Sequence, residues 1–277
     1  MLKIDPAHPS FSFLYGGEKP EQWLTAAQTS QTTATQDGTV VRTLRYTLPD
    51  GLVVTQTIRE WGESGALHWV LDWENTGSAD SSSISRVWDC DVTFPFEPDQ
   101  PGVPGFQNPA STLKVVSTVG SNGVRDEFNP REQQLFMGAP LTYSCWGGRS
   151  SQGLMPFFDL NHGERGVLAA IGWTGQWSAT FTRGDGTARI QTGIDGVDLI
   201  LHPGEHIRTS SILLLPYENG QQAAHVAFRR LIKHHFSLIG KTRPAGKRAA
   251  VHDELGRALL RRNVRTGQRA KGTRPGF

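Results

Sequence analysis

Apolar and polar residues alternate along most of the chain between residues 39 and 211. In the clearest segment, 67–73, every second residue is Leu or Trp, and the residues between them are His, Val and Asp. Successive side chains of a β-strand point to opposite faces, so a period of two predicts a strand. Its Leu and Trp face, which includes Trp69 and Trp73, is expected to lie in the core.

Glycine-containing turns join several of these alternating segments. Pro49 presets its own backbone dihedral and Gly51 can adopt the positive φ of a tight turn, so a hairpin is predicted around them. A second hairpin is predicted around Gly184 and Gly186 by the same argument. The expected strands of the two hairpins are 44–48, 52–58, 177–181 and 188–190, and further strands are expected at 112–119, 167–173, 197–201 and 207–215. Many short strands separated by Gly and Pro indicate an all-β fold, a large antiparallel sandwich.

Two segments depart from the strand pattern. Residues 94–108 contain four prolines, which cannot donate to a β-ladder, so this segment is expected to be a loop. Residues 219–237 are expected to form a helix, because Ala224, Phe228 and Leu231 lie on one apolar stripe with basic residues outside it. It is the one helix that the periodicity clearly predicts.

The net charge of +2 over 277 residues is distributed unevenly. Residues 240–277 carry 11 basic and 2 acidic residues, whereas residues 1–239 carry 17 basic and 24 acidic ones. We therefore expect a β-sandwich domain over 1–239 and a basic, mostly disordered tail over 240–277. The tail would attract phosphate groups, but it lacks aromatic residues before Phe277, so no specific nucleic-acid site is expected.

Composition and spacing exclude several classes of protein and site. Two cysteines do not make a disulfide scaffold, and the scattered histidines lack metal-ligand spacing, so no metal site is expected. The glycine-rich stretches lack the Lys and helix of a phosphate loop, no nucleophile motif occurs, and no cofactor is expected. No export signal and no long apolar run is found, so a cytoplasmic protein without a membrane span is expected.

The eight tryptophans suggest a platform on which a sugar ring could stack. Trp146 is the candidate for exposure, because it lies where a predicted strand gives way to the polar stretch Gly-Gly-Arg-Ser-Ser. Loops at the ends of a sandwich commonly carry binding residues. The candidate substrate-binding residues are therefore Trp146, Arg149 and Ser150.

Two groups of ionisable residues could act in proton transfer, and each also has a structural interpretation. Asp89 and Asp91 would share one side of a strand, where they could serve a reaction, although such a pair is more often a solvated edge. His202 and Glu205 could be an acid and a base, as in an aldose epimerase, but the Pro-Gly between them favours a surface turn.

Two stretches carry a family resemblance, residues 153–160 (Gly-Leu-Met-Pro-Phe-Phe-Asp-Leu) and residues 171–177 (Ile-Gly-Trp-Thr-Gly-Gln-Trp). Supporting segments occur in the family order from about Phe11 to His235. The chain resembles the N-terminal domain of glycoside hydrolase family 36, the melibiase-type α-galactosidases. The resemblance implies a galactose-mutarotase-like β-supersandwich and an association with galactosides.

The same resemblance bears on catalysis. In that family both catalytic carboxylates belong to a (β/α)₈ barrel that follows the sandwich. A barrel needs roughly 250 residues, whereas 38 residues follow Ile239. No catalytic residue is therefore assigned, and we expect a truncated or split α-galactosidase that does not hydrolyse alone, with a separately encoded barrel as a partner. The alternatives are a stand-alone galactoside-binding module and an aldose-epimerase-like protein.

Overall fold

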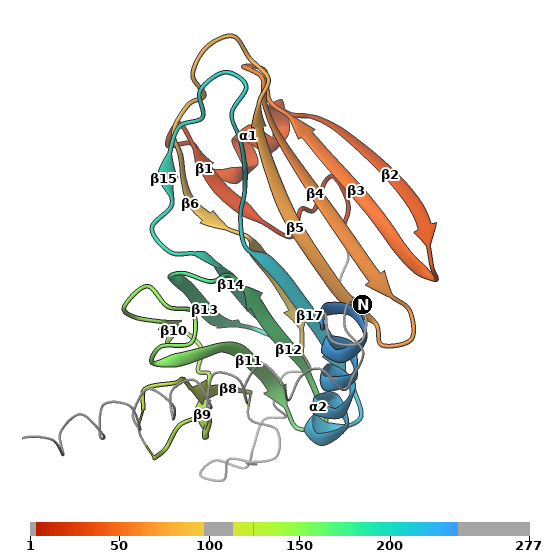
Figure 1. Ribbon diagram of the computed structural model, residues 1–277, viewed down its shortest axis with the longest axis vertical. Coiled ribbons are helices and arrows are strands. Elements are labelled where there is room, and N and C mark those ends of the chain that lie inside the picture. The colour runs from red at the N-terminus through yellow and green to blue at the C-terminus, as the bar shows by residue number, and fades with distance from the viewer. Residues whose placement is uncertain (1–3, 97–112, 124, 238–277) are drawn as a thin grey trace, which may run out of the picture. The chain divides into compact units, whose positions relative to one another are not determined.

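The computed structural model describes residues 4–96, 113–123 and 125–237 (Figure 1). The chain divides into two compact units, residues 1–228 and 229–277, and the first contains all the described strands. The domain boundary expected at residue 239 and the basic tail 240–277 lie outside the described residues, as does most of the loop expected at 94–108. The start of that loop was predicted wrongly, because Phe94 and Pro95 end a strand and pair with Ala188 and Thr187.

The path through the largest sheet runs β2-β3-β4-β5-β17-β12-β11-β8-β9 (Figure 1). Its tenth strand, β16, pairs with β5. Every strand pairing in it is antiparallel. In chain order its strands are β2 (Gln28–Gln36), β3 (Thr39–Thr47), β4 (Leu52–Trp61), β5 (Ala66–Asn75), β8 (Lys114–Val119), β9 (Pro130–Gln134), β11 (Leu154–His162), β12 (Arg165–Gly172), β16 (His206–Arg208) and β17 (Ser211–Tyr217).

Two smaller sheets complete the unit. A four-stranded sheet, in the order β10-β13-β14-β7, consists of β7 (Cys90–Pro95), β10 (Leu141–Ser144), β13 (Trp177–Gly184) and β14 (Thr187–Ile194). A three-stranded sheet, in the order β1-β6-β15, consists of β1 (Ser12–Tyr15), β6 (Ile84–Trp88) and β15 (Asp198–Leu199). Their pairings are antiparallel as well, so the expected antiparallel all-β fold is confirmed.

One hydrophobic core joins the three sheets. Phe158 of the ten-stranded sheet meets Trp177 of the four-stranded sheet edge to face, with ring centroids 5.6 Å apart. Phe13 of the three-stranded sheet meets Trp73 of the ten-stranded sheet in the same way at 4.8 Å. Trp69, Trp73 and Trp177 are fully buried, as expected for Trp69 and Trp73 from the alternation along β5. The layers are held together by aromatic packing between sheets.

Both predicted hairpins are present, as β3–β4 and β13–β14. Gly51 has a φ of +97°, and a Cβ placed on it would lie 2.5 Å from the backbone nitrogen of Gly77. Glycine is therefore required in the first turn for conformation and for space.

The predicted segment 207–215 is two strands, not one. β16 pairs with β5 through Ile207 and its neighbours, and β17 begins at Ser211, so the ladder is interrupted at Thr209 and Ser210. Ser210 instead donates its backbone N–H and its hydroxyl to the carboxylate of buried Asp89. This side-chain acceptor replaces a ladder partner, which alternation along one strand could not reveal.

Helices cover three segments of the described chain. Helix α1 (Pro20–Ala26), which the periodicity did not predict, begins with a proline that is favourable in the first turn, and Gln22 accepts the N–H of Lys19 at 2.9 Å. Helix α2 (Gly220–Leu231) and a π-helical turn (Ile232–Phe236) fall within the helix expected at 219–237. No helix among the described residues is long and apolar enough to cross a membrane.

The start of α2 is fixed to the ten-stranded sheet by a buried carboxylate. Asp159 on β11 is 3 % exposed, and it accepts hydrogen bonds from the Tyr217 hydroxyl at 2.8 Å and from the Gln221 side chain at 2.9 Å. Asn161 in turn donates to the Tyr217 oxygen at 2.7 Å. Burial raises the pKa of Asp159. The polar cluster compensates for burying these groups and sets where the helix leaves the sheet.

Candidate functional site

The loop between β10 and β11, residues 145–153, brings together the three residues that the sequence suggests for binding. Trp146 is 59 % exposed, so the exposure expected for it is confirmed. Arg149 is also exposed, and Ser150 is partly buried. All three occupy one short segment at the end of the strands, where side chains are free to meet a ligand.

Hydrogen bonds to neighbouring segments hold this loop in place. The N–H of Ser150 donates to the carbonyl of Thr174 at 3.2 Å, and the indole N–H of Trp177 donates to the carbonyl of Ser150 at 2.8 Å. On the other side, the N–H of Ser121 donates to the carbonyl of Ser151 at 2.8 Å. Because Trp177 is fully buried, the loop is tied directly to the core.

The indole of Trp146 lies against Gly153, at the far end of the same loop. A Cβ placed on Gly153 would come within 1.7 Å of the indole nitrogen. The N–H of Gly153 donates to the Asn122 side chain at 2.9 Å, which fixes the glycine next to the indole nitrogen. One part of the indole is thus supported by the protein while more than half of the residue's surface stays exposed.

Replacing Gly153 by alanine is expected to displace the Trp146 indole. Gly153 has a φ of +82°, so the substitution should also cost about 1–2 kcal/mol in backbone strain. Gly123→Ala is the matched control, because its φ is +74° but nothing lies within 4 Å of the added Cβ. The indole N–H resonance of Trp146 should move in Gly153→Ala only. Equal movement in both variants would show that the contact does not orient the ring.

Arg149 supplies the polar part of the loop. Its Nε donates to the side-chain oxygen of Gln152 at 2.9 Å, and Gln152 donates its own N–H to the carbonyl of Arg149 at 3.0 Å. Gln152 therefore orients the guanidinium through its Nε, and the Arg149 side chain that carries the two terminal nitrogens is exposed. An exposed indole beside an oriented guanidinium can stack on an apolar ring face and donate hydrogen bonds to hydroxyl groups.

The two aspartates around Cys90 are not a solvated edge, and the structure gives each one internal partners. Asp89 precedes β7 and is fully buried, with Ser210 donating to it. Burial raises the pKa of Asp89 to about 6. Asp91 receives two hydrogen bonds from Arg189, at 2.6 and 2.7 Å. Both carboxylates therefore serve in packing the strands together.

His202 and Glu205 lie in an exposed turn after β15. The Glu205 carboxylate accepts the backbone N–H of His202 at 2.8 Å, and the His202 ring contacts Asp80 at 2.8 Å. This hydrogen bond to Asp80 raises the pKa of His202. The arrangement corresponds to the surface turn that Pro203-Gly204 favours, with Glu205 bonded inside the turn and the His202 ring in contact with Asp80 outside it.

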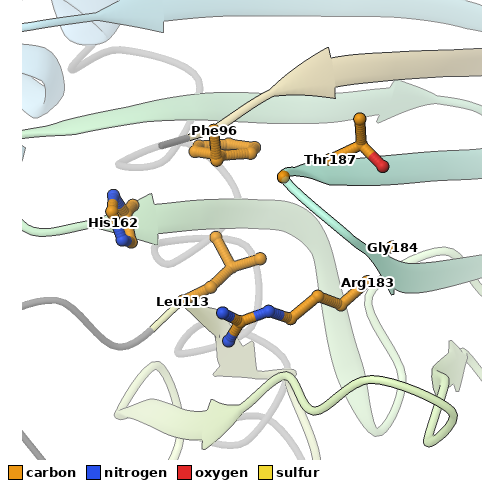
Figure 2. A pocket seen from close by; sticks show the side chains of 7 residues that line it. Phe96, Leu113, His162, Arg183, Gly184 and Thr187 are labelled. Atoms are coloured by element: carbon orange, nitrogen blue, oxygen red, sulfur yellow. The ribbon is translucent and has the colours of Figure 1, made fainter. Parts of the chain in front are cut away.

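Among the hollows in the described part of the chain, two differ greatly in volume. The first, shown in Figure 2, lies among Phe96, His162 and Arg183 and has a volume of about 10 Å³, room for roughly one water. The second is an open cavity of about 380 Å³ beside the β3–β4 turn, lined by Tyr15, Trp23, Asp50 and neighbours. Its Asp50 carboxylate accepts the Tyr15 hydroxyl. Sequence patterns missed this cavity, because its walls come from distant segments.

No group of three or more potential metal ligands occurs among residues 4–96, 113–123 and 125–237. Several ionisable side chains of the described residues form pairs instead, such as Arg189 with Asp91 and His202 with Asp80. The loop 145–153 therefore remains the candidate site that combines exposure with a fixed geometry.

Comparison with known proteins gives a match in structure alone. No protein-family model and no curated protein matches the chain. Among solved structures, the chain matches AgaA, an α-galactosidase of glycoside hydrolase family 36 from Geobacillus stearothermophilus in complex with raffinose. The TM-score is 0.60 and the identity 16 %, and the match covers 82 % of this chain and 32 % of AgaA. The α-galactosidase from Lactobacillus brevis matches with a TM-score of 0.63 and 14 % identity over 81 % and 31 %. The galactosidase domain of the α-galactosidase-sucrose kinase AgaSK matches with a TM-score of 0.62 and 13 % identity over 84 % and 33 %.

These similarities agree with the fold that the sequence resemblance implies. They cover most of this chain and about a third of each matched chain. At such low identity they establish architecture and leave the activity to be argued from the site. The chain therefore has the β-supersandwich fold of a part of the family 36 α-galactosidases and spans about a third of the length of those proteins.

Proposed function

We propose that this chain is a carbohydrate-binding β-sandwich domain of the α-galactosidase type, which takes a galactose-containing sugar at the loop 145–153. The observation that carries the proposal is Trp146, an indole that is 59 % exposed although a hydrogen-bonded loop holds its backbone. Large exposed aromatic side chains on ordered loops are common in binding sites. The fold that the chain shares with family 36 enzymes supports a sugar as the ligand.

The chemistry of the loop suits a sugar better than a charged or wholly apolar ligand. The indole offers a flat surface for the C–H face of a pyranose, and Arg149 offers N–H donors for its hydroxyl groups. Because an open loop buries a small part of a ligand, the affinity for a single galactose should be weak. Residues outside this chain would then complete the pocket.

Truncating Trp146 is expected to weaken this binding. In Trp146→Ala the stacking surface is lost, so the dissociation constant for galactose measured by calorimetry should rise about tenfold. Trp146→Phe keeps an aromatic ring and serves as the control, with a much smaller rise. Equal affinity in the wild type and in Trp146→Ala would contradict the assignment of this loop as the site.

We also propose that hydrolysis requires a catalytic barrel outside these 277 residues. The described residues form a sandwich, and the carboxylates of buried Asp89 and Asp159 and of partly buried Asp91 all accept hydrogen bonds from internal partners. A retaining glycosidase needs two carboxyl groups about 5 Å apart that flank the scissile bond. A barrel supplied by another segment or another chain would provide that pair.

The purified chain is accordingly expected to release no detectable product from p-nitrophenyl α-galactoside. A family 36 α-galactosidase at the same concentration provides the positive control. Turnover that follows the purified chain through successive chromatographic steps and is lost in a buried-core variant would contradict the proposal. For the aldose-epimerase alternative, Glu205 accepts the backbone N–H of His202 and the His202 ring contacts Asp80, so both groups have partners and the geometry favours binding over epimerisation.

A further inference from the structure

Strand β2 forms one edge of the ten-stranded sheet and has an unusual composition for that position. Its nine residues, Gln-Thr-Ser-Gln-Thr-Thr-Ala-Thr-Gln, include no charged residue and no proline. All nine are exposed, and each has a Cα partner on β3. Within the described part of the chain, β2 pairs with β3 on one side only. The outward backbone groups of Gln28–Gln36 are called the β2 edge below.

An open edge of this length is a template for another strand. Proteins commonly block such edges with charged side chains, prolines, bulges or very short strands. The pairing of β2 with β3 runs without a register shift from Gln28 to Gln36, so the edge has no bulge. None of these blocking features is therefore present in β2.

The opposite edge of the same sheet is different. Strand β9 has five residues and begins with Pro130, followed by Arg131 and Glu132. Glu132 pairs with Lys114 at 2.8 Å, and Arg131 pairs with Asp126 at 3.2 Å. One edge thus carries proline and charge while the other carries neither. Pairing of β2 in one copy with β9 in the next copy would join copies in an open row. This pairing is disfavoured, because β9 is short and charged.

We propose that the β2 edge pairs with the β2 edge of a second copy of this chain, antiparallel and around a two-fold axis at Thr32. In that register Gln28 lies opposite Gln36 of the partner subunit, and Thr29 lies opposite Thr35 of the partner subunit. Pairs of this kind form favourable cross-strand contacts, and no like charges meet because the strand has none. The symmetric pairing uses both edges and closes as a dimer.

The proposal does not depend on sugar binding, since the β2 edge and the loop 145–153 share no residue. A ladder of nine residues covers less area than a typical stable interface, so the dimer should be weak. Sedimentation velocity across about a hundredfold range of concentration should show a reversible monomer and dimer. Hydrogen exchange should slow at alternate amides of β2 as the concentration rises.

Charge at the axis gives a direct test. Thr32→Lys places two lysines opposite each other and should raise the dimer dissociation constant at least about tenfold, and Thr32→Glu should do the same. Mixing the two variants should restore association, because opposite charges then meet at the axis. Ser78→Lys, at an exposed loop residue, changes the net charge equally and should leave association unchanged.

Three results would overturn the proposal. The first is a wild-type protein that stays monomeric at every concentration. This result includes the case in which the β2 amides are protected at every concentration because another segment of the same chain covers the edge. The second is association that Thr32→Lys does not weaken. The third is a failure of the Lys and Glu variants to associate when mixed, which would exclude the axis at Thr32. Circular dichroism of each variant establishes that the fold is intact.

Discussion

Replacing Trp69 by alanine is expected to lower the free energy of unfolding by about 3–5 kcal/mol. Its side chain is fully buried at the centre of β5, and its indole N–H donates to the backbone carbonyl of Asp89 at 2.7 Å. The substitution leaves a cavity and removes the donor from a buried acceptor, and both effects act in the same direction. The free energy of unfolding of a domain is typically about 5–15 kcal/mol, so this one substitution should remove a large part of it.

The same substitution at Trp146 provides the control for this prediction. Trp146 is 59 % exposed, and Trp146→Ala should therefore change the stability by less than about 1 kcal/mol. Urea unfolding of both variants, followed by far-UV circular dichroism, measures the difference. Similar losses in the two variants would mean that the core and loop positions of these tryptophans are wrong.

The second large effect is an opposed pH dependence of two buried groups. Burial raises the pKa of Asp89 to about 6. Burial and, to a smaller extent, the positive charges of Arg59 and Arg208 lower the pKa of His68 to about 4. The folded protein thus favours the neutral form of both side chains. Asp159 shifts in the same direction as Asp89 because it too is buried.

The sign of each contribution follows from which state binds more protons. Between about pH 4 and 6 the folded state holds a proton on Asp89 that the unfolded state has released, so this stabilisation, about 3 kcal/mol, is lost as the pH rises. For His68 the unfolded state binds the extra proton, so a similar amount of about 3 kcal/mol is lost as the pH falls from about 6.5 to 4. The two contributions oppose each other over the same range.

Single variants should separate these contributions. Relative to the wild type, Asp89→Asn should lose stability more steeply on acidification between about pH 6 and 4, because His68 is no longer offset. His68→Gln should change in the opposite sense and gain stability relative to the wild type as the pH falls. Urea unfolding at a series of pH values measures both. Parallel curves for the two variants and the wild type would contradict the burial of either group.

Part of the fold follows from local pattern, although some strands with an apolar face, such as β7 and β11, are not among the predicted ones. The alternation along β5 and the turn residue Gly51 identify a strand and a hairpin without reference to distant parts of the chain. The structure adds that both faces of β5 are largely covered, since His68 and Val70 are buried together with Trp69. Which strands lie on either side of β5 decides this burial, and a single strand's sequence does not contain that information.

Three other features that the sequence did not predict have physical reasons in common. Strand β2 has no apolar face, so hydrophobic alternation cannot detect it, and β3 defines it by pairing. Helix α1 has seven residues, too few for a helical period to be distinctive. The interruption at Ser210 depends on Asp89, a residue more than a hundred positions earlier in the chain. Each of these features is set by a partner and not by local preference.

The candidate site shows the same division between local and distant information. The change from a predicted strand to Gly-Gly-Arg-Ser indicated that Trp146 would be exposed, and it is. The contacts that hold the loop come from Thr174, Trp177 and Asn122, and these could not be inferred from residues 145–153. Sequence could therefore suggest which residues to consider, whereas their support and orientation required the folded chain.

The most direct test of the proposed function is the set of indole N–H resonances of the eight tryptophans during a titration with galactose. Trp146 is expected to shift progressively and to saturate, while the buried Trp69, Trp73 and Trp177 stay unchanged. The Trp146 resonance is assigned by its loss in Trp146→Phe. A spectrum in which no indole moves at saturating galactose, or in which Trp146 alone fails to move, would contradict the account.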